Sequence, residues 1–476
     1  MKVIKFGGTS IGTPDLFLRV AEIISGRFKK EFTIVVLSAI GGITDKLINA
    51  IEFSSSGNQK YIGILEEIKS IHYVFLSKVI AVNNQHQTKD QLDKLFSELE
   101  NKLKGVFLLQ ECSDRISDSI VTFGELLSST LLVESLKSQG INSEFHNAKK
   151  LIRTNSNYGD ADVSFSVTNQ LLQEWYTGLN QNQIPAVNGF TGSDENGYVT
   201  SLGRSGSDFT ATIIGGALNA SIVEIWTDVD GVLSADPKVV SSAITLNRLS
   251  YNEASSLAVL GGKVIHPKTI APVEKQNVPI SILNTFNPKV KGTFIGNADN
   301  QNDVEIKTIT FLKNLLSISI YETESIYGQK IYARLFGLLA QLEIPIITII
   351  KSANGQSMSI IVQSEFEHLF LEKIKSEFIP EIEKNFIGNI NSRNNLSLVS
   401  VIGISQNVKS LIVRRIHDVL DNYGIHSLIF LDDPYSLNIS FIVDAPEVEK
   451  TVNVLHEEFF GESITSVKES KAVNFG

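Results

Sequence analysis

The sequence has a single cysteine, Cys112, among 476 residues, so it can form neither an intramolecular disulfide nor a thiolate metal cluster. Its histidines are scattered, without an HExxH or paired spacing, and we therefore predict no protein-ligated metal site. It also lacks a dense lysine or arginine run, and its 42 basic and 52 acidic residues give a net charge of −10. That balance disfavours nucleic acid as a partner.

Long apolar segments are missing too. No apolar run approaches the roughly 18 residues that a membrane helix needs. Met1–Phe6 leads straight into a glycine turn, without the apolar core of a signal peptide. We therefore expect no membrane segment and a cytoplasmic protein. The apolar share of 42% is that of ordinary globular proteins and excludes a mainly disordered chain.

Apolar strands that alternate with glycine turns and helices dominate the first 300 residues. Val3–Phe6 is followed by a helix that opens at Pro14, and the pattern recurs after a second apolar strand at 33–37. This order is typical of an α/β fold with a parallel sheet covered on both faces. The polar, helix-patterned residues 60–110 predict a helical excursion. Further buried strands are expected at 184–188, 222–227 and 280–284.

The chain repeats itself after a polar linker at 297–303. Residues 331–362 align without a gap on 412–443, at an offset of 81, and each copy has the order strand, helix, strand, strand, helix. That order needs one more strand to complete a ferredoxin-like sandwich, so we predict two such small domains in tandem. The C-terminal strand is a candidate to complete the first of them. The predicted domains are 1–300, 305–390 and 395–476.

A lysine at the end of the first strand is followed by two glycines and two hydroxyls, in Lys5–Ser10. Glycines allow main-chain N–H groups to approach phosphate oxygens, and the lysine supplies a positive charge at a transferring phosphoryl group. The segment is not a Walker A sequence, so it does not imply the P-loop fold. A tight turn beside a solvated lysine is the alternative interpretation.

Two further segments carry side chains suited to a charged ligand. The small residues of Gly203–Ala211 stand at a predicted helix start, which suits an anion. Arg204 can grip a carboxylate through two parallel hydrogen bonds, whereas Asp208 could equally be a plain helix cap. Trp226–Val232 ends an apolar strand, where open α/β sheets place their ligands, although a charged turn would look the same.

Two single residues each allow both a structural and a functional interpretation. Glu125 begins a predicted helix, where a carboxylate suits the helix dipole whether or not it binds a ligand. His266 invites a catalytic interpretation, but we prefer a hydrogen-bonded structural role at a junction between strand and helix.

Five segments of the chain occur in one order and together closely resemble the motif set of the aspartate kinases, of the amino acid kinase superfamily. They are Lys5–Ser10, Phe123–Glu125, Gly203–Ala211, Trp226–Val232 and Lys263–Pro267. The tandem repeat is similar to the paired ACT domains of that family, so the resemblance covers essentially the whole chain. It implies an α/β parallel-sheet sandwich of amino acid kinase type, followed by two ferredoxin-like ACT domains of α+β class. Because the chain stops after the second repeat, the expectation is a monofunctional enzyme and not a fusion with homoserine dehydrogenase.

The resemblance implies that MgATP phosphorylates the side-chain carboxylate of L-aspartate to give 4-phospho-L-aspartate, the first step toward lysine, threonine and methionine. A carboxylate with a pKa of about 4 is already ionised at neutral pH, so the acceptor needs no general base. Catalysis must then hold two anions together and neutralise charge during the transfer. ATP and Mg²⁺ are the cofactors implied.

Site residues are carried over from the positions that match the family motifs. The catalytic residues would be Lys5 and Asp208. The aspartate-binding residues would be Thr44, Glu125, Arg204 and Ser207. The ATP-binding residues would be Lys5, Gly7, Gly8, Thr227, Asp228, Lys238, Lys263 and Val264. In this assignment Asp208 orients Lys5, while Arg204 binds the substrate α-carboxylate and Glu125 its ammonium.

The chain departs from the family at nucleotide and effector positions. Leu233 stands where a nucleotide-stacking tyrosine is usual, and Lys238 replaces an arginine, which removes the two-pronged hydrogen bonding of a guanidinium. Lysine-inhibited relatives carry Gly-Phe-Leu and a following aspartate where this chain has Lys330–Tyr332 and Ile347. A lysine site of that pattern is therefore not predicted, and the identity of any amino-acid effector stays open.

Two other functions stay open. A kinase of the same fold could act on glutamate, N-acetylglutamate or a nucleotide, although Glu125 with Arg204 and the ACT region argue against it. A non-catalytic amino-acid sensor is the second, and the intact pair of Lys5 and Asp208 disfavours it. Because sheet edges of paired ferredoxin-like domains commonly pair between subunits, we predict a homodimer through the ACT region, with small molecules, and neither nucleic acid nor membrane, as other partners.

Overall fold

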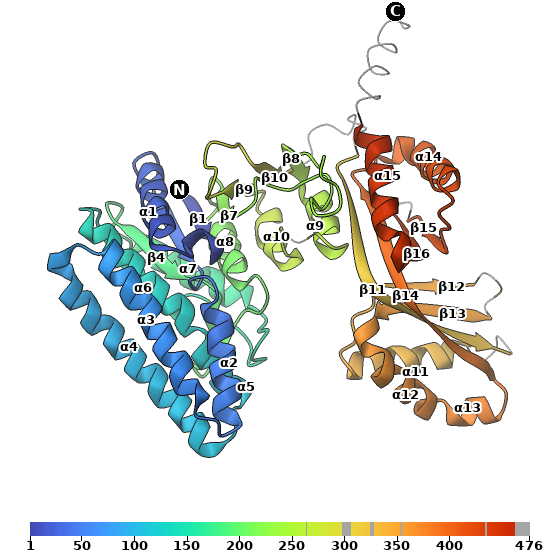
Figure 1. Cartoon of the computed structure of the whole chain (residues 1–476), viewed down its shortest axis with the longest axis horizontal. Helices are drawn as coiled ribbons and strands as arrows, with labels where there is room; N and C mark the ends of the chain where they lie inside the picture. Colours follow the sequence, from blue (N-terminus) through green and yellow to red (C-terminus); the bar gives the residue numbers. More distant parts are fainter. Residues whose placement is uncertain are drawn as a thin grey trace, which may run out of the picture. The chain divides into compact units, whose positions relative to one another are not determined.

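The chain forms two compact units, and Figure 1 labels their helices and strands. The computed structural model describes residues 1–262, 264–297, 306–323, 328–352, 354, 356–433 and 436–461. The first unit comprises Met1–Val232, Thr245–Ala258 and Lys263–Asp299. The second unit comprises Leu233–Ile244, Val259–Gly262 and Asn300–Gly476. Most of the predicted linker at 297–303, and the predicted C-terminal strand, lie outside the described residues.

The first unit differs from the predicted domain 1–300 in two short segments that pack with the second unit, Leu233–Ile244 and Val259–Gly262. Ala235 and Val240 are buried in a core of the second unit, and the Ile309 N–H donates to the Ser234 carbonyl at 2.8 Å. Because the packing of these segments with the second unit depends on tertiary contacts, no local sequence pattern predicts it.

The first unit is built on an eight-stranded sheet. In order across the sheet its strands are β3 (Ser143–His146), β4 (Ile184–Asn188), β2 (Thr33–Leu37), β1 (Lys2–Phe6), β7 (Val223–Thr227), β9 (Ile280–Asn284), β10 (Thr293–Gly296) and β8 (Arg248–Ser250). In this order, the neighbours β3, β4, β2, β1, β7 and β9 are all parallel to one another. The strands predicted at 33–37, 184–188 and 280–284 are confirmed with those bounds. A separate ribbon pairs β5 (Thr191–Ser193) with β6 (Val199–Ser201).

The sheet is predominantly parallel, as predicted, with an antiparallel pairing near its far edge. β10 runs antiparallel to β9 and parallel to β8. The connection 285–292 between β9 and β10 is too short for a helical crossover, which parallel neighbours need and which takes roughly a dozen residues or more. A direct return of the chain therefore leaves β10 antiparallel.

Helices cover both faces of the sheet and place Lys5 on a defined face. The helices of this unit are α1 (Pro14–Phe28), α2 (Ile43–Ser55), α3 (Lys60–Val79), α4 (Val82–Leu109), α5 (Asp114–Val121), α6 (Phe123–Ser138), α7 (Phe165–Thr177), α8 (Gly206–Ala217), α9 (Tyr251–Val259) and α10 (Pro267–Glu274). Ile4 and Phe6 join the large core that α1–α6 share with the sheet. Because side chains alternate along a strand, Val3 and Lys5 face the other way, toward α8, which packs on β1.

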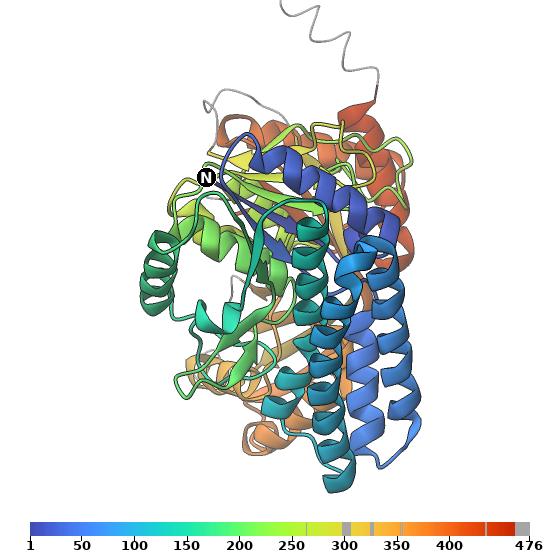
Figure 2. The ribbon, with the colours of Figure 1, turned by 90° about the vertical axis from the view of Figure 1, so that its left-hand side faces the viewer.

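The predicted helical excursion at 60–110 is confirmed as α3 and α4. In Figure 2 the blue and teal helices of this region stand side by side, and α2, α3, α4 and α6 contact one another. Within the described residues, Asp114–Ser138 is long and apolar enough by length and composition to cross a membrane. However, 72% of its most apolar stretch is buried inside the protein. Burial of that kind is usual for a core helix.

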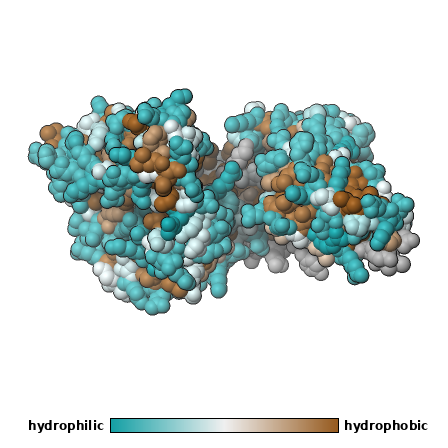
Figure 3. Space-filling view, turned by 90° about the horizontal axis from the view of Figure 1, so that it is seen from below, coloured by the Kyte–Doolittle hydropathy of each residue, from teal (hydrophilic) through white to brown (hydrophobic). Residues whose placement is uncertain are grey.

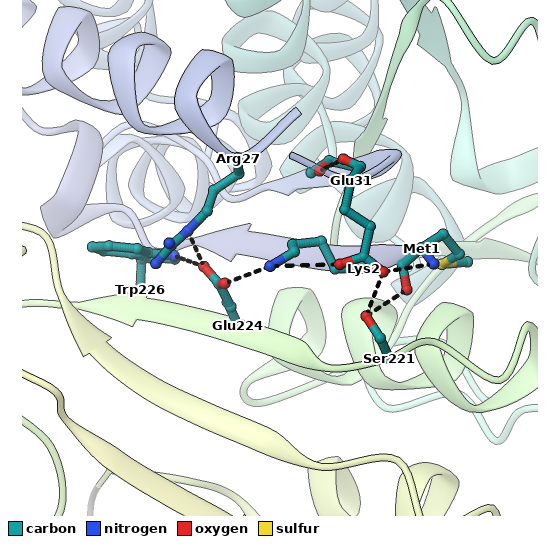
Figure 4. A network of polar contacts seen from close by, with 8 residues as sticks. Met1, Lys2, Arg27, Glu31, Ser221, Glu224 and Trp226 are labelled. Atoms are coloured by element: carbon teal, nitrogen blue, oxygen red, sulfur yellow. Dashed lines mark hydrogen bonds and ion pairs between the residues drawn. The ribbon is translucent and has the colours of Figure 1, made fainter. Parts of the chain in front are cut away.

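A buried polar network joins β1, β7 and α1 at the sheet centre (Figure 4). Glu224 on β7 is 4% exposed, and its carboxylate lies 3.3 Å from Lys2 Nζ and 3.1 Å from Arg27 Nε. The Trp226 indole N–H donates to the same carboxylate at 3.0 Å, and the Arg27 guanidinium lies over the indole ring. Two cations and one N–H donor thus compensate the buried charge.

The second unit is one six-stranded antiparallel sheet. In order across it the strands are β12 (Thr348–Lys351), β13 (Ser357–Gln363), β11 (Thr308–Glu322), β14 (Ile387–Ile402), β16 (Asn438–Asp444) and β15 (Ile429–Leu431). Its helices are α11 (Gly328–Gln341), α12 (Glu367–Glu377), α13 (Ile379–Glu383), α14 (Lys409–Asn422) and α15 (Val448–Phe460). Short 3₁₀ turns in the chain are η1 (Thr9–Ile11), η2 (Ala148–Lys150), η3 (Ser364–Phe366), η4 (Gln406–Val408) and η5 (Ala445–Glu447).

The two repeats share this sheet through their long strands. The first half of β14 pairs with β11 over 317–322 and directly follows α13, so it completes a ferredoxin-like order for the first repeat. The first half of β11, 308–312, pairs with the end of β14 and supplies the fourth strand of the second repeat. The predicted boundary at 390–395 therefore falls inside a continuous strand.

The offset of 81 persists in the contacts of the described residues. The Ser319 and Ser359 hydroxyls hydrogen bond at 2.7 Å, and those of Ser400 and Ser440 do the same. Matched ion pairs, each beside a matched phenylalanine, are Arg334–Glu377 over Phe378 and Arg415–Glu458 over Phe459. The repeat predicted from sequence is therefore a repeat of interactions as well as of elements.

Candidate functional site

Lys5 and Asp208, 203 positions apart in the sequence, meet in the first unit. Lys5 Nζ lies 2.5 Å from Asp208 Oδ1, and the two side chains are only 9% and 14% exposed. Lys5 comes from the end of β1, and Asp208 from the first turn of α8. An ion pair removed from water in this way fixes the position of the ammonium more than it adds stability.

The glycine turn after β1 packs main chain against main chain. A Cβ on Gly8 would lie 2.9 Å from the Ala39 carbonyl oxygen, closer than real side chains come. The Gly41 N–H donates to the Gly8 carbonyl at 3.1 Å, so the turns after β1 and β2 are joined. A Cβ on Gly7 would lie 3.5 Å from Lys5 Nζ. The Gly7 N–H donates to the Trp226 carbonyl at 3.1 Å. This amide is therefore bonded to β7, whereas it was predicted to donate to phosphate.

The start of α8 needs special backbone geometry. Gly203 has φ +72° and Ser205, the residue before the helix, has φ +55°, both in the left-handed region that favours glycine. Ser207 is buried and presses on Gly189, where a Cβ would come within 2.6 Å of the serine Cβ. Arg204 is exposed, so its guanidinium is free to reach a ligand at this turn.

Glu125 lies in the first turn of α6 and is 4% exposed. Burial raises the pKa of its carboxyl group to about 8, against the opposing effects of main-chain hydrogen bonds and of the Lys5 charge. Its Oε2 has no hydrogen-bond partner among the described residues. A buried acceptor of this kind is suited to a ligand with N–H donors. Thr44, half-buried in the first turn of α2, follows the glycine turn that contacts Gly8.

The end of β7 supplies two of the predicted ATP-binding residues. Thr227 is the last residue of the strand, and its hydroxyl lies 3.1 Å from Asp228 Oδ1. Asp230 is held by the Asn284 side-chain amide at 2.8 Å. Because β1, β2, β7 and β9 are parallel, their carboxyl ends lie at one edge of the sheet, where open α/β sheets bind ligands.

Three predicted ATP-binding residues are not brought to this edge by the described contacts. Lys238 is exposed and belongs to the segment that packs with the second unit. Lys263 lies outside the described residues, and Val264 follows it as a half-buried residue. Their assignment to ATP stays a prediction.

His266 has the hydrogen-bonded structural role predicted for it, but it lies between α9 and α10 and not at the predicted junction of strand and helix. It precedes α10, and its Nδ1 accepts the Lys268 N–H at 3.3 Å, which satisfies one free amide of the helix start. Burial lowers the pKa of its imidazole, and Arg204 contributes to that effect while Asp208 opposes it. His266 therefore lies within electrostatic reach of the α8 start.

Comparisons with known proteins agree with this geometry. The model of the amino acid kinase family matches residues 1–284. Chloroplastic aspartokinase 1 of Arabidopsis thaliana is 30% identical over 464 residues, covering 96% of this chain and 80% of that protein. The chain belongs to the amino acid kinase family, among the aspartokinases. It spans 56% of the length of the bifunctional aspartokinase/homoserine dehydrogenase of Buchnera aphidicola, which is 30% identical over 467 residues and 97% of this chain.

Solved aspartokinase structures share the fold over nearly the whole chain. Aspartokinase III of Escherichia coli in complex with aspartate and ADP, in its R-state, has 26% identity and a TM-score of 0.83, covering 97% of this chain and 100% of that one. The same enzyme with lysine and aspartate, in its T-state, has 25% identity and a TM-score of 0.76, covering 97% and 99%. The predicted α/β kinase fold followed by ACT-like repeats is thus confirmed.

Two acidic residues that lie against the segment before α8 were not predicted from the sequence. Asp118 is 3% exposed, and its carboxylate accepts the Gly159 N–H, the Ser201 N–H at 2.7 Å and the Ser201 hydroxyl at 2.8 Å. Asp160 lies against Gly203, where a Cβ would clash with its carboxylate, and pairs with Lys268 at 2.5 Å. A lone aspartate in a helix or loop carries no signal that distinguishes it from a solvated one.

The described residues offer no protein cage for a metal ion. Nowhere in the described ranges do three or more His, Cys, Asp or Glu side chains converge in a way that could hold one. A surface hollow of about 530 Å³ is present, but none of its lining residues, among them Arg153, Asn155 and Glu195, is a predicted site residue. We therefore place the site by its chemistry, at Lys5 and Asp208, and not by the size of a hollow.

Proposed function

We propose that the chain transfers the γ-phosphoryl group of ATP to the side-chain carboxylate of L-aspartate, at the edge of the sheet where β1 and β7 end. The observation that carries this proposal is the buried contact of 2.5 Å between Lys5 and Asp208. The bound aspartate and ADP named for the similar Escherichia coli structure support it. The product is 4-phospho-L-aspartate, and the reaction belongs to amino-acid biosynthesis.

Charge neutralisation is the chemistry that this site can supply. The acceptor is already an anion at neutral pH, so the reaction needs two anions brought together and no proton removed. Lys5 places a positive charge where the phosphoryl group passes, and Asp208 holds that ammonium in place. Preorganised charge of this kind stabilises a transition state without reorganisation during the reaction.

Arg204 and Glu125 suit the two ends of an amino acid. The exposed guanidinium of Arg204 can bind an α-carboxylate in two-pronged fashion, and the unpartnered Glu125 oxygen can accept from an α-ammonium. Thr44 and Ser207 border the same turns. A substrate with charges of opposite sign then fits better than one that lacks an ammonium, such as N-acetylglutamate.

We propose that Mg²⁺ enters with ATP. Mg²⁺ usually keeps several waters and binds through substrate phosphates and one or two carboxylates, and the absence of a carboxylate cluster among the described residues fits that mode. Asp208 is the carboxylate at the site that would help hold it. The ion would neutralise phosphate charge beside Lys5.

An amino-acid effector and a homodimer through the ACT-like repeats are further parts of this proposal. The lysine named for the Escherichia coli T-state structure supports a regulatory ligand. β12 and β15 are the sheet edges of the second unit, and apolar side chains remain on the surface of this unit (Figure 3). Ile349 on β12 and Ile346, just before that strand, are both exposed. A cytoplasmic location stays a prediction.

Hydroxylamine trapping of the acyl phosphate tests the proposed reaction. The full chain with MgATP should form a hydroxamate from L-aspartate and release ADP in step with it. L-glutamate, N-acetylglutamate and nucleoside monophosphates, assayed by ADP release, are the comparison acceptors. Turnover with one of these and none with L-aspartate, from protein with a cooperative unfolding transition, would contradict the proposal.

A further inference from the structure

Lys409, the first residue of α14 in the second repeat, is a buried lysine whose ammonium group contacts three oxygen acceptors. The residue is 6% exposed. Its Nζ lies 2.7 Å from Asp432 Oδ1, and it donates to the Ser436 carbonyl at 3.1 Å and to the Asp433 carbonyl. An ammonium group has three N–H donors, and the turn after β15 supplies three acceptors.

This position is unfavourable for a lysine unless the turn compensates it. Burying an ammonium removes its hydration, and a cation in the first turn of a helix opposes the helix dipole. Asp432 and the two carbonyl oxygens offset both effects. These three acceptors therefore make up a cation site, and the occupant of that site is a side chain of the same molecule.

The first repeat lacks both halves of this arrangement. At the offset of 81, Lys409 corresponds to Gly328 and Asp432 corresponds to Lys351. The strand register supports the match, because Lys351 directly follows Ile350, which pairs with Ser359 just as Leu431 pairs with Ser440. The repeats keep their serine pairs and their arginine–glutamate pairs, whereas the first repeat has no counterpart of the pair of Lys409 and Asp432.

We propose that Lys409 is a built-in ligand, whose ammonium fills a site for a primary ammonium group formed by Asp432 and the carbonyls of Asp433 and Ser436. While Lys409 is in place, this site of the second repeat is closed to small primary amines and to the α-ammonium of free amino acids. The inference concerns the second repeat alone and does not depend on the proposed kinase reaction.

Truncation of Lys409 followed by chemical rescue tests this inference. Lys409→Ala removes the ammonium from these three acceptors, and Asp432 is exposed, so a small cation can enter. Propylammonium chloride should then raise the unfolding midpoint of the full-length variant saturably, by roughly 2–4 °C. Tetramethylammonium chloride at the same concentration has no N–H donor and should not. Lys409→Met fills the space with an apolar chain and should show no rescue.

Lys450 provides the matched control in the same repeat. Its ammonium donates to the Tyr423 carbonyl at 2.7 Å, but the residue is exposed, so Lys450→Ala should be insensitive to propylammonium. The inference is overturned if folded Lys409→Ala responds equally to both cations or to neither.

Amine labelling of the unaltered chain keeps the test decisive if Lys409→Ala does not fold. Acetylation followed by mass spectrometry should modify Lys409 at least tenfold more slowly than Lys450. Asp432→Asn should speed labelling at Lys409 and leave Lys450 unchanged. Equal labelling of the two lysines in the unaltered chain would overturn the inference.

Discussion

Glu125 shows how one buried side chain can set a pH dependence. Burial raises the pKa of its carboxyl group to about 8, whereas in an unfolded chain the pKa stays near its ordinary value of 4.5. Between these two values the folded state holds a proton that the unfolded state has lost. The free energy of unfolding must therefore fall as pH rises through this window.

Glu125→Gln should remove this part of the pH dependence. The amide keeps the shape of the side chain and stays neutral, so its stability relative to the unaltered chain should improve steadily from pH 4.5 to pH 8. Urea unfolding of both proteins at several pH values measures the difference. A gap that stays constant across the window would contradict the assignment of the raised pKa to Glu125.

Aspartate binding should respond to the same carboxyl group with the opposite trend. An ammonium ligand favours the ionised form, so below pH 8 binding must first displace a proton. The affinity for L-aspartate should therefore rise as pH increases toward 8, and Glu125→Gln should both weaken binding and flatten the profile. Isothermal titration with L-aspartate at pH 6.5, 7.25 and 8 provides the measurement, and a profile equally steep in the variant would argue against this role.

At the scale of elements, the joined turns after β1 and β2 hold Lys5 in place. Gly8→Ala would put a Cβ 2.9 Å from the Ala39 carbonyl oxygen, and a main-chain oxygen cannot move aside. We therefore expect the free energy of unfolding to fall by about 1–3 kcal/mol and kcat to fall with it. Gly26→Ala, in α1, is the matched control. A Cβ there meets nothing within 4 Å, so the free energy of unfolding should rise by about 0.5–1 kcal/mol. Denaturant unfolding and turnover of both variants decide the point. Equal effects of the two substitutions would rule out the close approach as the cause.

Elements set by local pattern were predictable from the sequence, and those set by distant partners were not. The short apolar runs at 33–37 and 280–284 favour buried strands through their length and their β-branched residues, and Pro14 marks the start of α1 in the sequence and in the structure. The Lys5 and Asp208 pairing followed from a motif resemblance that spans the chain. Glu224 and Asp118 acquire their roles only from partners brought by other elements, and the packing of Leu233–Ile244 with the second unit has no local signal.

At the scale of the whole molecule, the edge strand β12 is where we expect a second copy to pair. Ile349 on this strand is 40% exposed, and an exposed apolar edge invites strand pairing unless a partner covers it. Ile349→Lys should weaken the dimer at least tenfold by sedimentation, because a charge on the edge opposes pairing. Leu369→Lys, at a residue 42% exposed on α12, should leave it unchanged. A monomer at micromolar concentration for the unaltered chain would refute the predicted homodimer.

The proposed catalytic role of Lys5 depends on its strand, on its turn and on its partner Asp208 on α8, which together fix the position of one ammonium group. Lys2 lies on the same strand and also pairs with a buried carboxylate, at 3.3 Å from Glu224, so it is the natural comparison. The most direct test is kcat for hydroxylamine-trapped aspartyl phosphate with Lys5→Met and Lys2→Met. We expect a loss of roughly 10²–10³ for Lys5→Met and a kcat close to that of the unaltered chain for Lys2→Met. A Lys5→Met enzyme that turns over as fast as Lys2→Met would contradict the account.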